Sequence, residues 1–479
     1  MDAPETPDIE PITSTHKMRL TAVIVASALF MQNLDSTVIA TGLPAMAKSF
    51  HADPLHMSVA LTSYLISLSV FIPASGWAAD RFGSRTVFRA AIVVFTLGSI
   101  ACGLAPSLSF LVAARIIQGI GGAMMVPVGR LVLLRSISRA QMVAAMSWIT
   151  MPALVGPVVG PPLGGLIVTY FSWRWIFDIN IPIGIIGAIA VTMFIPDVKE
   201  ADGGGKLDLM GLILTGITMA CMMAGFETVG RGIIPLPYTL GLFAVGLTAG
   251  GLYGWHAHGH PHPVLDFSLM RIPTFASSVI AGSLFRVAIG AMPFLLPLML
   301  QLAFGETALQ SGLITFASAV GALSMKPAAQ PVLRWFGFRT VLVVNGILSA
   351  GFVAICALFN PGWPSLLLSS VLLLGGLFRS LQFTAFNSIA YGDVPRARMS
   401  AATSLYSTVQ QLTLTLGIVI GAAILETATL LRHHSAASTS DFGVAFIGVS
   451  LIAAIAIPIC AMLPRDAGEA LSGHHAGDK

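Results

Sequence analysis

The stretch MQNLDSTVIATGLP, residues 31–44, contains an ionisable side chain in surroundings that disfavour charge. Asp35 lies in a run that is otherwise apolar or weakly polar and begins near Thr21. If this run crosses a membrane, a carboxylate within it costs about 2.5–3.5 kcal/mol on insertion scales. The chemistry open to a lone buried carboxyl group is the binding and release of a proton. We therefore expect Asp35 to be retained because it titrates.

Arg115 is a second ionisable residue inside an apolar run, at a depth comparable to that of Asp35. A helix over 20–44 would leave Asp35 roughly 13 Å from its outer end, and a helix over 109–131 would leave Arg115 roughly 9 Å from the same face. A dry cavity favours the protonated carboxyl, whereas a nearby Arg favours the ionised one. Alternating exposure to the two sides would change both influences, so Asp35 and Arg115 could couple proton movement to a cycle. A fixed ion pair that only orients the helices is the alternative.

Two further cations fall inside apolar runs of the C-terminal half. Arg286 would lie near the middle of its helix, and Arg379 toward the cytoplasmic end of its own. An intramembrane charge marks a functional site by default. Snorkelling of the long side chain to the interface is the alternative, and it is stronger for Arg379. We expect Arg286 and Arg379, together with Gln118 of the N-terminal half, to contribute to substrate binding.

These residues need helices that cross a membrane, and the composition indicates many of them. The 479 residues are 55% hydrophobic and 10% charged, with a mean hydropathy of +0.85, whereas soluble chains carry about 25% charged residues. Apolar runs of about 20 residues recur along the whole chain. The sequence therefore predicts an all-α integral membrane protein with fourteen spans, over residues 20–44, 56–78, 87–104, 109–131, 142–167, 175–195, 208–227, 237–255, 274–301, 307–329, 339–359, 364–390, 401–426 and 443–463.

The distribution of Lys and Arg gives the predicted orientation. With the N-terminus in the cytoplasm and alternate loops assigned to the two sides, most of the 25 Lys and Arg fall on the cytoplasmic side. Cytoplasmic loops carry this excess in membrane proteins, and a miscounted helix would destroy the bias beyond the error. We expect both termini in the cytoplasm. No basic stripe lies outside the spans, so nucleic acid is not an expected partner.

Internal similarity predicts two halves of six helices each. Gly417 and Gly421 match Gly160 and Gly164 at one offset, and Gly337 and Arg339 match Gly83 and Arg85 at a nearly equal one. Parallel six-helix repeats that face each other are a transporter architecture with a substrate site near midplane. The predicted division is a cytoplasmic tail (1–19), an N-terminal bundle (20–200), two inserted helices with linkers (201–260), a C-terminal bundle (261–465) and a second cytoplasmic tail (466–479).

Several motifs together resemble those of a known transporter family. GWAADRFGSR (76–85), RIIQGIGGAMMVPVGR (115–130) and GPVVGPPLGG (156–165) resemble the loop, fourth-helix and fifth-helix motifs of the major facilitator superfamily. LDSTVIATGLP (34–44) and WRWIFDINIPIG (173–184) resemble signatures of its fourteen-helix drug:proton antiporter branch, the EmrB and QacA type. LPLMLQ and QFTAFNSIA add a similarity to the MdtD-like multidrug exporters within that branch. The motifs occur in this order over nearly the whole chain.

The resemblance implies roles for two groups of residues. In the loop motif, Asp80 can cap a neighbouring helix and pair with an Arg of the other half, because both interactions are favourable near helix ends. This implies a gating latch formed by Gly76, Asp80, Arg81, Gly83 and Arg85, with plain charge anchoring as the alternative. The second copy has Leu333 in place of Asp80, which implies a weaker latch.

In the fifth-helix motif, the row Gly156, Gly160 and Gly164 permits close helix approach, and Pro157 removes a backbone donor and bends the helix. The resemblance implies that Gly156, Pro157, Gly160 and Gly164 limit leakage in an antiporter. Simple tight packing is compatible with the same residues.

No cofactor, metal or enzymatic chemistry is expected. The run HAHGHPH (256–262) holds four His, but no carboxylate or Cys set in the sequence closes a coordination shell around it. The sequence contains neither G-x-x-x-x-G-K-[ST] for ATP nor H-E-x-x-H for zinc hydrolysis. The four Cys stand singly in apolar runs and are expected to pack as small hydrophobic residues.

The expected function is proton-coupled efflux by alternating access, in the cell inner membrane, with a small molecule and protons as ligands and the lipid bilayer as surroundings. One deep acid against three Arg suits an anionic, zwitterionic or neutral amphiphile better than a dication. An exporter of an organic acid or another metabolite is therefore the main alternative, and a transporter-like membrane sensor a weaker one. The sequence does not indicate a membrane-fusion partner.

Overall fold

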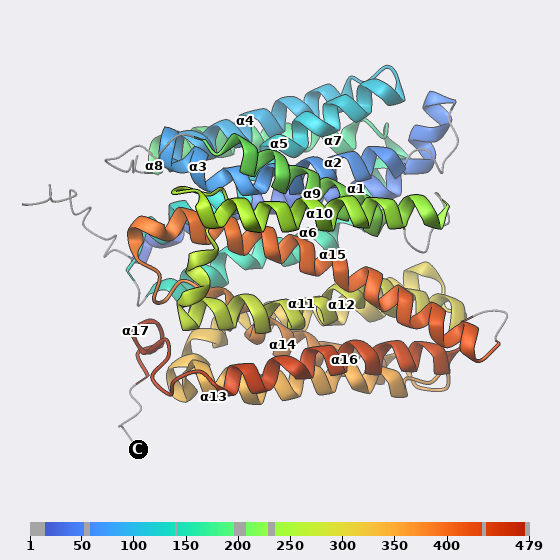
Figure 1. Ribbon diagram of the computed structural model, residues 1–479. Coiled ribbons are helices and arrows are strands. Elements are labelled where there is room, and N and C mark those ends of the chain that lie inside the picture. The colour runs from blue at the N-terminus through green and yellow to red at the C-terminus, as the bar shows by residue number, and fades with distance from the viewer. Residues whose placement is uncertain are drawn as a thin grey trace, which may run out of the picture. The chain divides into compact units, whose positions relative to one another are not determined.

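The structure is a computed structural model that describes residues 15–51, 58–138, 141–195, 207–228, 235–433 and 437–474. Within these ranges the chain is helical and contains no strand. It divides into two compact units (Figure 1), the first formed by 1–224, 242–267 and 395–408, and the second by 225–241, 268–394 and 409–479. Each unit is described separately below.

The first unit holds most of the N-terminal helices, and it includes the start of a helix from the C-terminal part of the chain. Its elements are α1 (Thr15–Phe50), α2 (Ser58–Phe71), the 3₁₀ segment η1 (Ile72–Ala74), α3 (Ser75–Phe82), α4 (Ser84–Gly103), α5 (Leu108–Ser136), α6 (Met142–Tyr170), α7 (Trp175–Asp178), α8 (Asn180–Phe194), most of α9 (Leu209–Thr228) and α10 (Leu236–Gly259), and the first turns of α15 (Met399–Leu431). Pro73 lies inside η1, and the backbone donor that it removes accounts for the break between α2 and α3.

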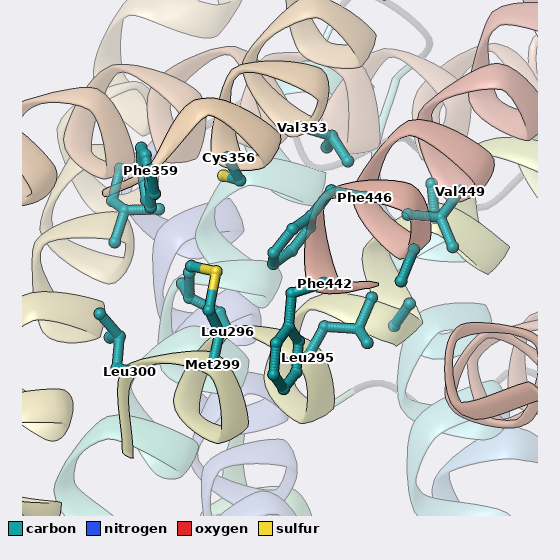
Figure 2. Packing of buried hydrophobic residues seen from close by; sticks show 14 of the residues in the cluster. Leu295, Leu296, Met299, Leu300, Val353, Cys356, Phe359, Phe442, Phe446 and Val449 are labelled. Atoms are coloured by element: carbon teal, nitrogen blue, oxygen red, sulfur yellow. The ribbon is translucent and has the colours of Figure 1, made fainter. Parts of the chain in front are cut away.

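The second unit is built from the remaining helices. They are α11 (Pro273–Leu298), continued by the π-helical segment η4 (Met299–Ala303), then α12 (Ala308–Ser324), α13 (Lys326–Ile355), α14 (Ser365–Ile389), the rest of α15, α16 (Thr439–Ala461) and the short α17 (Glu469–Ser472). Its core lies between α11, α13, α14 and α16. Figure 2 shows Phe442 and Phe446 of α16 close to Leu295 of α11 within this apolar cluster.

The core of the first unit is a separate apolar cluster. It joins α1, α4, α5 and α7 through buried side chains that include Leu34, Val38, Leu111, Ile176 and Phe177. This cluster surrounds the stretch of α1 that carries Asp35, so the polar site described below is enclosed by hydrocarbon.

The predicted all-α membrane class is confirmed, and the helices lie near the expected spans. Twelve helices in the described ranges are long and apolar enough to cross a membrane. The two remaining positions, the fifth and tenth expected spans, are taken by α6 and by the 17-residue α12. The count of fourteen spans and the predicted domain boundaries remain predictions.

Two expected loops are wrong in detail. The predicted loop 80–85 is helical up to Phe82, and Gly83 alone separates α3 from α4. The connection between the expected spans 307–329 and 339–359 lies inside α13, which begins at Lys326 and bends at Gly337. Gly83 (φ 85°, ψ 137°) and Gly337 (φ 72°, ψ 162°) share a backbone conformation that L side chains rarely adopt. In each of the two matching segments, a single glycine therefore changes the direction of the chain where a polar loop was expected.

Candidate functional site

Asp35 is the centre of a buried polar network in the first unit. Its Oδ2 accepts a hydrogen bond from Arg115 Nη1 at 2.6 Å, and both side chains are fully buried. Its Oδ1 accepts from Gln118 Nε2 at 2.9 Å and from Asn180 Nδ2 at 3.1 Å. The carboxylate thus receives three donors, from α5 and α8, which compensate much of the cost of removing its charge from water.

A second layer of hydrogen bonds holds these donors in place. Arg115 Nη1 also donates to Gln118 Oε1 at 2.6 Å, and Arg115 Nε donates to the carbonyl of Ala60 at 3.1 Å. Ser99 Oγ, on α4, accepts from Gln118 Nε2 at 3.0 Å and from Asn180 Nδ2 at 2.9 Å. Five side chains from four helices therefore form one connected network, in which a change at the carboxylate reaches every member.

An aromatic wall closes the network. The guanidinium carbon of Arg115 lies 4.2 Å from the centre of the Tyr64 ring and 5.8 Å from that of Phe177. Tyr64 and Phe177 are themselves completely buried. The carboxylate of Asp35 is therefore fully buried behind this wall.

The structure brings Asp35 and Arg115 together, and it places Gln118 in the same network. The expected role of Gln118 in substrate binding stays a prediction. Asn180, Ser99 and Tyr64 were not singled out from the sequence. The sequence could have indicated Asn180, because it is an amide between two isoleucines inside an apolar run. Ser99 and Tyr64 carried no such signal, because single Ser and Tyr residues are ordinary in membrane helices.

Two of the expected latch residues, Gly76 and Asp80, lie at the junction of α3, α5 and the first turns of α15, all within the first unit. Asp80 Oδ1 accepts from Arg135 Nη2 at 2.8 Å, and its Oδ2 accepts from the hydroxyl of Ser400 at the start of α15. Gly76 leaves no space for a side chain, because a Cβ there would lie 2.9 Å from the carbonyl oxygen of Ser400. Ser404 Oγ adds a bond of 2.7 Å to the carbonyl of Pro73.

The remaining latch residues do not share this junction. Arg81 is exposed, and Arg85 donates to the backbone carbonyl of Thr192 on α8. Gly83 supplies the positive φ that ends α3. Among the described residues, Asp80 is paired with Arg135 of the same half, and the expected pairing with an Arg of the other half stays a prediction.

The glycine row of α6 packs against α1 within the first unit. A Cβ on Gly156 would lie 2.9 Å from that of Asn33, and one on Gly160 would collide with the hydroxyl of Thr37. Gly164 is buried as well, and the side chain of Pro157 lies outside the described residues. The helix that carries Asp35 is therefore fixed against α6 by close backbone approach.

The second unit contains buried cations. Arg286 of α11 is 1% exposed, and its guanidinium carbon lies 5.9 Å from the centre of the Phe383 ring. Arg379 is half-buried on α14. Lys326, which was not singled out from the sequence, is 3% exposed at the start of α13 and donates to Thr384 Oγ1 at 2.9 Å. It lies at this position because α12 ends at Ser324 and α13 begins two residues later.

No metal was expected because no carboxylate was found near the His run in the sequence. The structure does place a carboxylate there. Asp208 precedes α9 and is far from the run in sequence, yet its Oδ1 lies 2.8 Å from Nε2 of His256. The two inserted helices α9 and α10 bring these residues together. Short-range spacing could not reveal this contact, because it depends on how two helices pair.

Comparison with known proteins agrees with this fold. The model of the major facilitator superfamily matches residues 25–418 and 278–474. The candidate multidrug resistance protein MdtD of Klebsiella pneumoniae (strain ATCC 700721 / MGH 78578) is 40% identical over 453 residues, which cover 93% of this chain and 94% of that relative. The protein of the same name from Salmonella newport (strain SL254) is 39% identical over 453 residues, covering 92% and 94%.

Solved structures resemble the chain in fold at low sequence identity. The human organic anion transporter MFSD10 gives a TM-score of 0.68 at 14% identity, covering 92% of this chain and 99% of that one. The proton:xylose symporter XylE gives 0.64 at 14% identity, covering 95% and 98%. The match to the family model and the identity to the MdtD relatives, each over most of the chain, place this protein in the major facilitator superfamily, as a multi-pass membrane transporter rather than an enzyme.

Proposed function

We propose that this transporter exports small organic molecules in exchange for protons, by alternating access, with Asp35 as the proton carrier. The observation that carries the proposal is the buried network in which Asp35 is bonded to Arg115, Gln118 and Asn180. The description of the MdtD relatives as multidrug resistance proteins supports drugs as one class of exported compound. The charge bias of the loops supports a cytoplasmic location for both termini, and the bacterial relatives support the inner membrane.

Protonation of Asp35 would weaken the network at its strongest point. The ionised carboxylate accepts three hydrogen bonds and pairs with Arg115. A neutral carboxyl loses the attraction to the guanidinium, and charge-assisted bonds are roughly twice as strong as neutral ones. Arg115 and Gln118 then become free to rearrange. Proton binding thus favours a second conformation, and differential affinity for two states is what a coupled carrier requires.

The contacts of Asp80 would connect this change at Asp35 to a movement of helices. Asp80 is bonded to Arg135 and to Ser400, and Ser400 lies in the first turn of α15, which continues into the second unit. Breaking the bond between Asp80 and Ser400 would release the start of α15 from α3. We assign the residues Gly76, Asp80 and Gly83 to this conformational step, with Arg81 and Arg85 anchoring the same end of the helices.

We assign substrate binding to the buried cations of the second unit. Their positive charge also favours a second candidate function, the export of organic acids. Arg286 and Lys326 are almost fully buried, and Arg379 acts on Lys326 electrostatically. Asp441, which caps the start of α16, is the one buried acid among the described residues of this unit. An excess of buried positive charge favours an anionic or zwitterionic substrate, so export of organic acids is the alternative to export of cationic drugs.

The test uses purified protein in liposomes with an imposed pH gradient. Wild-type protein is expected to move protons when an exported compound is supplied, and to accumulate that compound against its gradient. Asp35→Asn keeps the shape of the side chain and removes the titration, so uphill transport should cease while downhill exchange persists. Asp466→Asn is the matched control, because Asp466 is an exposed acid outside the network.

Two outcomes would contradict the proposal. Uphill export by Asp35→Asn at the wild-type rate would remove Asp35 from proton coupling. The absence of proton flux with every member of a panel of cationic, neutral and anionic compounds would count against antiport itself. Within the same panel, a preference for anions over cations of equal size would select the organic-acid alternative.

A further inference from the structure

The paired inserted helices α9 and α10 carry a second cluster of chemically active side chains. Asp208 precedes α9, and its Oδ1 accepts from the backbone N–H of Gly211 at 2.8 Å, as in a helix cap. Its side chain is 2% exposed. The other carboxylate oxygen, Oδ2, is buried and has no hydrogen-bond partner among the described residues. A cap needs one oxygen, so the second oxygen is available to a ligand.

Two histidines at the C-terminal end of α10 lie close to the same carboxylate. His256 lies in the last turn of α10, and His260 follows one turn later, so the two rings share a face, with their centres 5.3 Å apart. Nε2 of His256 is 2.8 Å from Asp208 Oδ1. One ligand atom from each of Asp208, His256 and His260 lies within 4.8 Å of the others.

The segment after α10 is held in a defined path next to this cluster. The hydroxyl of Tyr253 accepts from the backbone N–H of Leu265 at 2.7 Å and donates to its carbonyl at 2.9 Å. The ring of Tyr253 also packs edge-on against Phe267 at 5.9 Å between centres. His260 lies between these anchored points, so its backbone is positioned before any ligand binds.

We propose that Asp208, His256 and His260 form a binding site for one divalent transition-metal cation of the zinc type. Tetrahedral Zn²⁺ with bonds of about 2.0–2.1 Å places its ligand atoms about 3.3 Å apart. The present separations span 2.8 Å to at most 4.8 Å, so shifts of the two imidazole rings are enough to reach this geometry. Two imidazoles and one carboxylate suit zinc, whereas Ca²⁺ and Mg²⁺ prefer oxygen ligands alone. Water would complete the coordination.

The alternative is a helix cap reinforced by a histidine, and it leaves two observations unexplained. A hydrogen-bonded cap accounts for the contact of Asp208 with His256 and Gly211. It gives no role to His260 and no partner to the second oxygen of Asp208. Ionisation of Asp208 fits both readings: burial raises the pKa of this carboxyl, but the N–H of Gly211 and the contact with His256 outweigh it, so the net shift is downward.

Metal binding has a small local cost at His260. Its Nδ1 accepts a hydrogen bond from the backbone N–H of His262 at 3.2 Å. Ligation through Nδ1 would replace this bond, and ligation through Nε2 would give it up, because the other ring nitrogen then carries the proton. The bond is long, so its loss costs little against three metal–ligand bonds. The bound metal would join the start of α9 to the end of α10.

The test is zinc binding by purified full-length protein that carries no polyhistidine tag. Titration with ZnCl₂ in detergent is followed by calorimetry, and Co²⁺ is used in parallel because its visible absorption reports tetrahedral coordination by nitrogen and oxygen. We expect one Zn²⁺ per chain. Asp208→Asn, His256→Ala and His260→Ala should each weaken binding about 10-fold or more, as loss of a ligand does.

The chain supplies matched controls in the same run. His258 Nδ1 is bonded to the carbonyl of Gly254, and His262 is exposed, and neither belongs to the cluster. His258→Ala and His262→Ala should therefore bind zinc as the wild type does. Zinc should also raise the unfolding temperature of the wild type and of these two controls, but not that of the three ligand variants.

Three results would overturn the proposal. One is the absence of stoichiometric binding at micromolar zinc. Another is an equal loss of affinity in all five His and Asp variants, which would indicate loose association with the His run as a whole. The third is undiminished binding after His256→Ala or His260→Ala. If Asp208→Asn fails to fold because α9 loses its cap, the two histidine variants decide the question.

Discussion

The two units bury opposite charges on helices with corresponding surroundings. In the first unit, α1 is fixed against the glycine row of α6 at Thr37, and two residues earlier it carries Asp35. In the second unit, α11 is fixed against Gly417 of α15 at Val287, and one residue earlier it carries Arg286. The acid is neutralised by Arg115 and two amides. The corresponding helix of the second unit carries a buried cation, Arg286, where that of the first unit carries an acid.

The difference indicates a division of labour. A fully buried carboxylate with three donors can change its protonation only when the packing around it changes, which suits a switch coupled to conformation. The second unit buries the cations Arg286 and Lys326, and buried positive charge suits the recognition of an anionic group. We infer that the first unit handles the proton and the second unit holds the substrate.

Removal of Arg115 should have the largest effect, because it leaves a buried carboxylate without its countercharge. Breaking a buried pair by deleting one partner costs about 3–5 kcal/mol, whereas replacing both members by apolar residues is often neutral. Arg115→Met should therefore lower the free energy of unfolding in detergent by that amount. The double variant Asp35→Asn with Arg115→Met should recover most of it. Equal loss in the single and double variants would contradict the pairing.

Loss of a cation in the second unit should affect substrates and leave proton binding intact. A charged hydrogen bond contributes about 1.5–3 kcal/mol, so Arg286→Gln or Lys326→Gln should reduce the affinity for an anionic compound roughly 10-fold or more. Proton uptake by Asp35 is measured as the difference in pH change, on adding detergent-solubilised protein to unbuffered solution, between each variant and the same variant carrying Asp35→Asn. This difference should equal that between the wild type and Asp35→Asn. Phe383→Leu is the companion variant, because it removes the ring beside Arg286 and keeps the charge. An equal reduction for anionic and cationic compounds would refute the assignment.

The sequence predicted the class, the approximate spans, the buried acid and its Arg, because each depends on apolar length or on a charge in an apolar run. It did not predict Asn180 and Ser99 in the network, because their partners lie on other helices and no local spacing identifies them. The burial of Lys326 and the approach of Asp208 to His256 were missed for the same reason. Helix ends and helix pairing decided both, and they are the features that hydropathy resolves least well.

The two glycine contacts offer a direct comparison of packing. A Cβ on Gly417 would collide with the backbone carbonyl of Val287, whereas one on Gly160 would collide with the side chain of Thr37. A side chain can rotate away and a backbone cannot without moving the helix. Gly417→Ala should therefore cost about 1–3 kcal/mol, as overpacking does, and Gly160→Ala less. Thermal unfolding of the two variants, with Gly160→Ala also combined with Thr37→Ala, gives the comparison.

The combined variant decides that comparison. If Thr37→Ala relieves the cost of Gly160→Ala, the collision is with the hydroxyl, as the structure indicates. If Gly160→Ala is still as destabilising as Gly417→Ala when Thr37 is alanine, the contact of α6 with α1 is as rigid as that of α15 with α11. The expected difference between the two contacts would then be wrong.

The smallest expected effect concerns the glycines that bend the chain in the two copies of the repeat. Gly83 and Gly337 have φ values of 85° and 72°, and an L side chain in such a conformation costs roughly 1–2 kcal/mol. At Gly337 a Cβ would also lie 2.8 Å from the ring of His474. Gly83→Ala should show the backbone cost alone, and Gly337→Ala should exceed it until His474→Ala removes the ring. Unfolding temperatures of the three variants measure this, and equal losses at Gly337 with and without the His474 ring would show that the backbone conformation alone requires glycine.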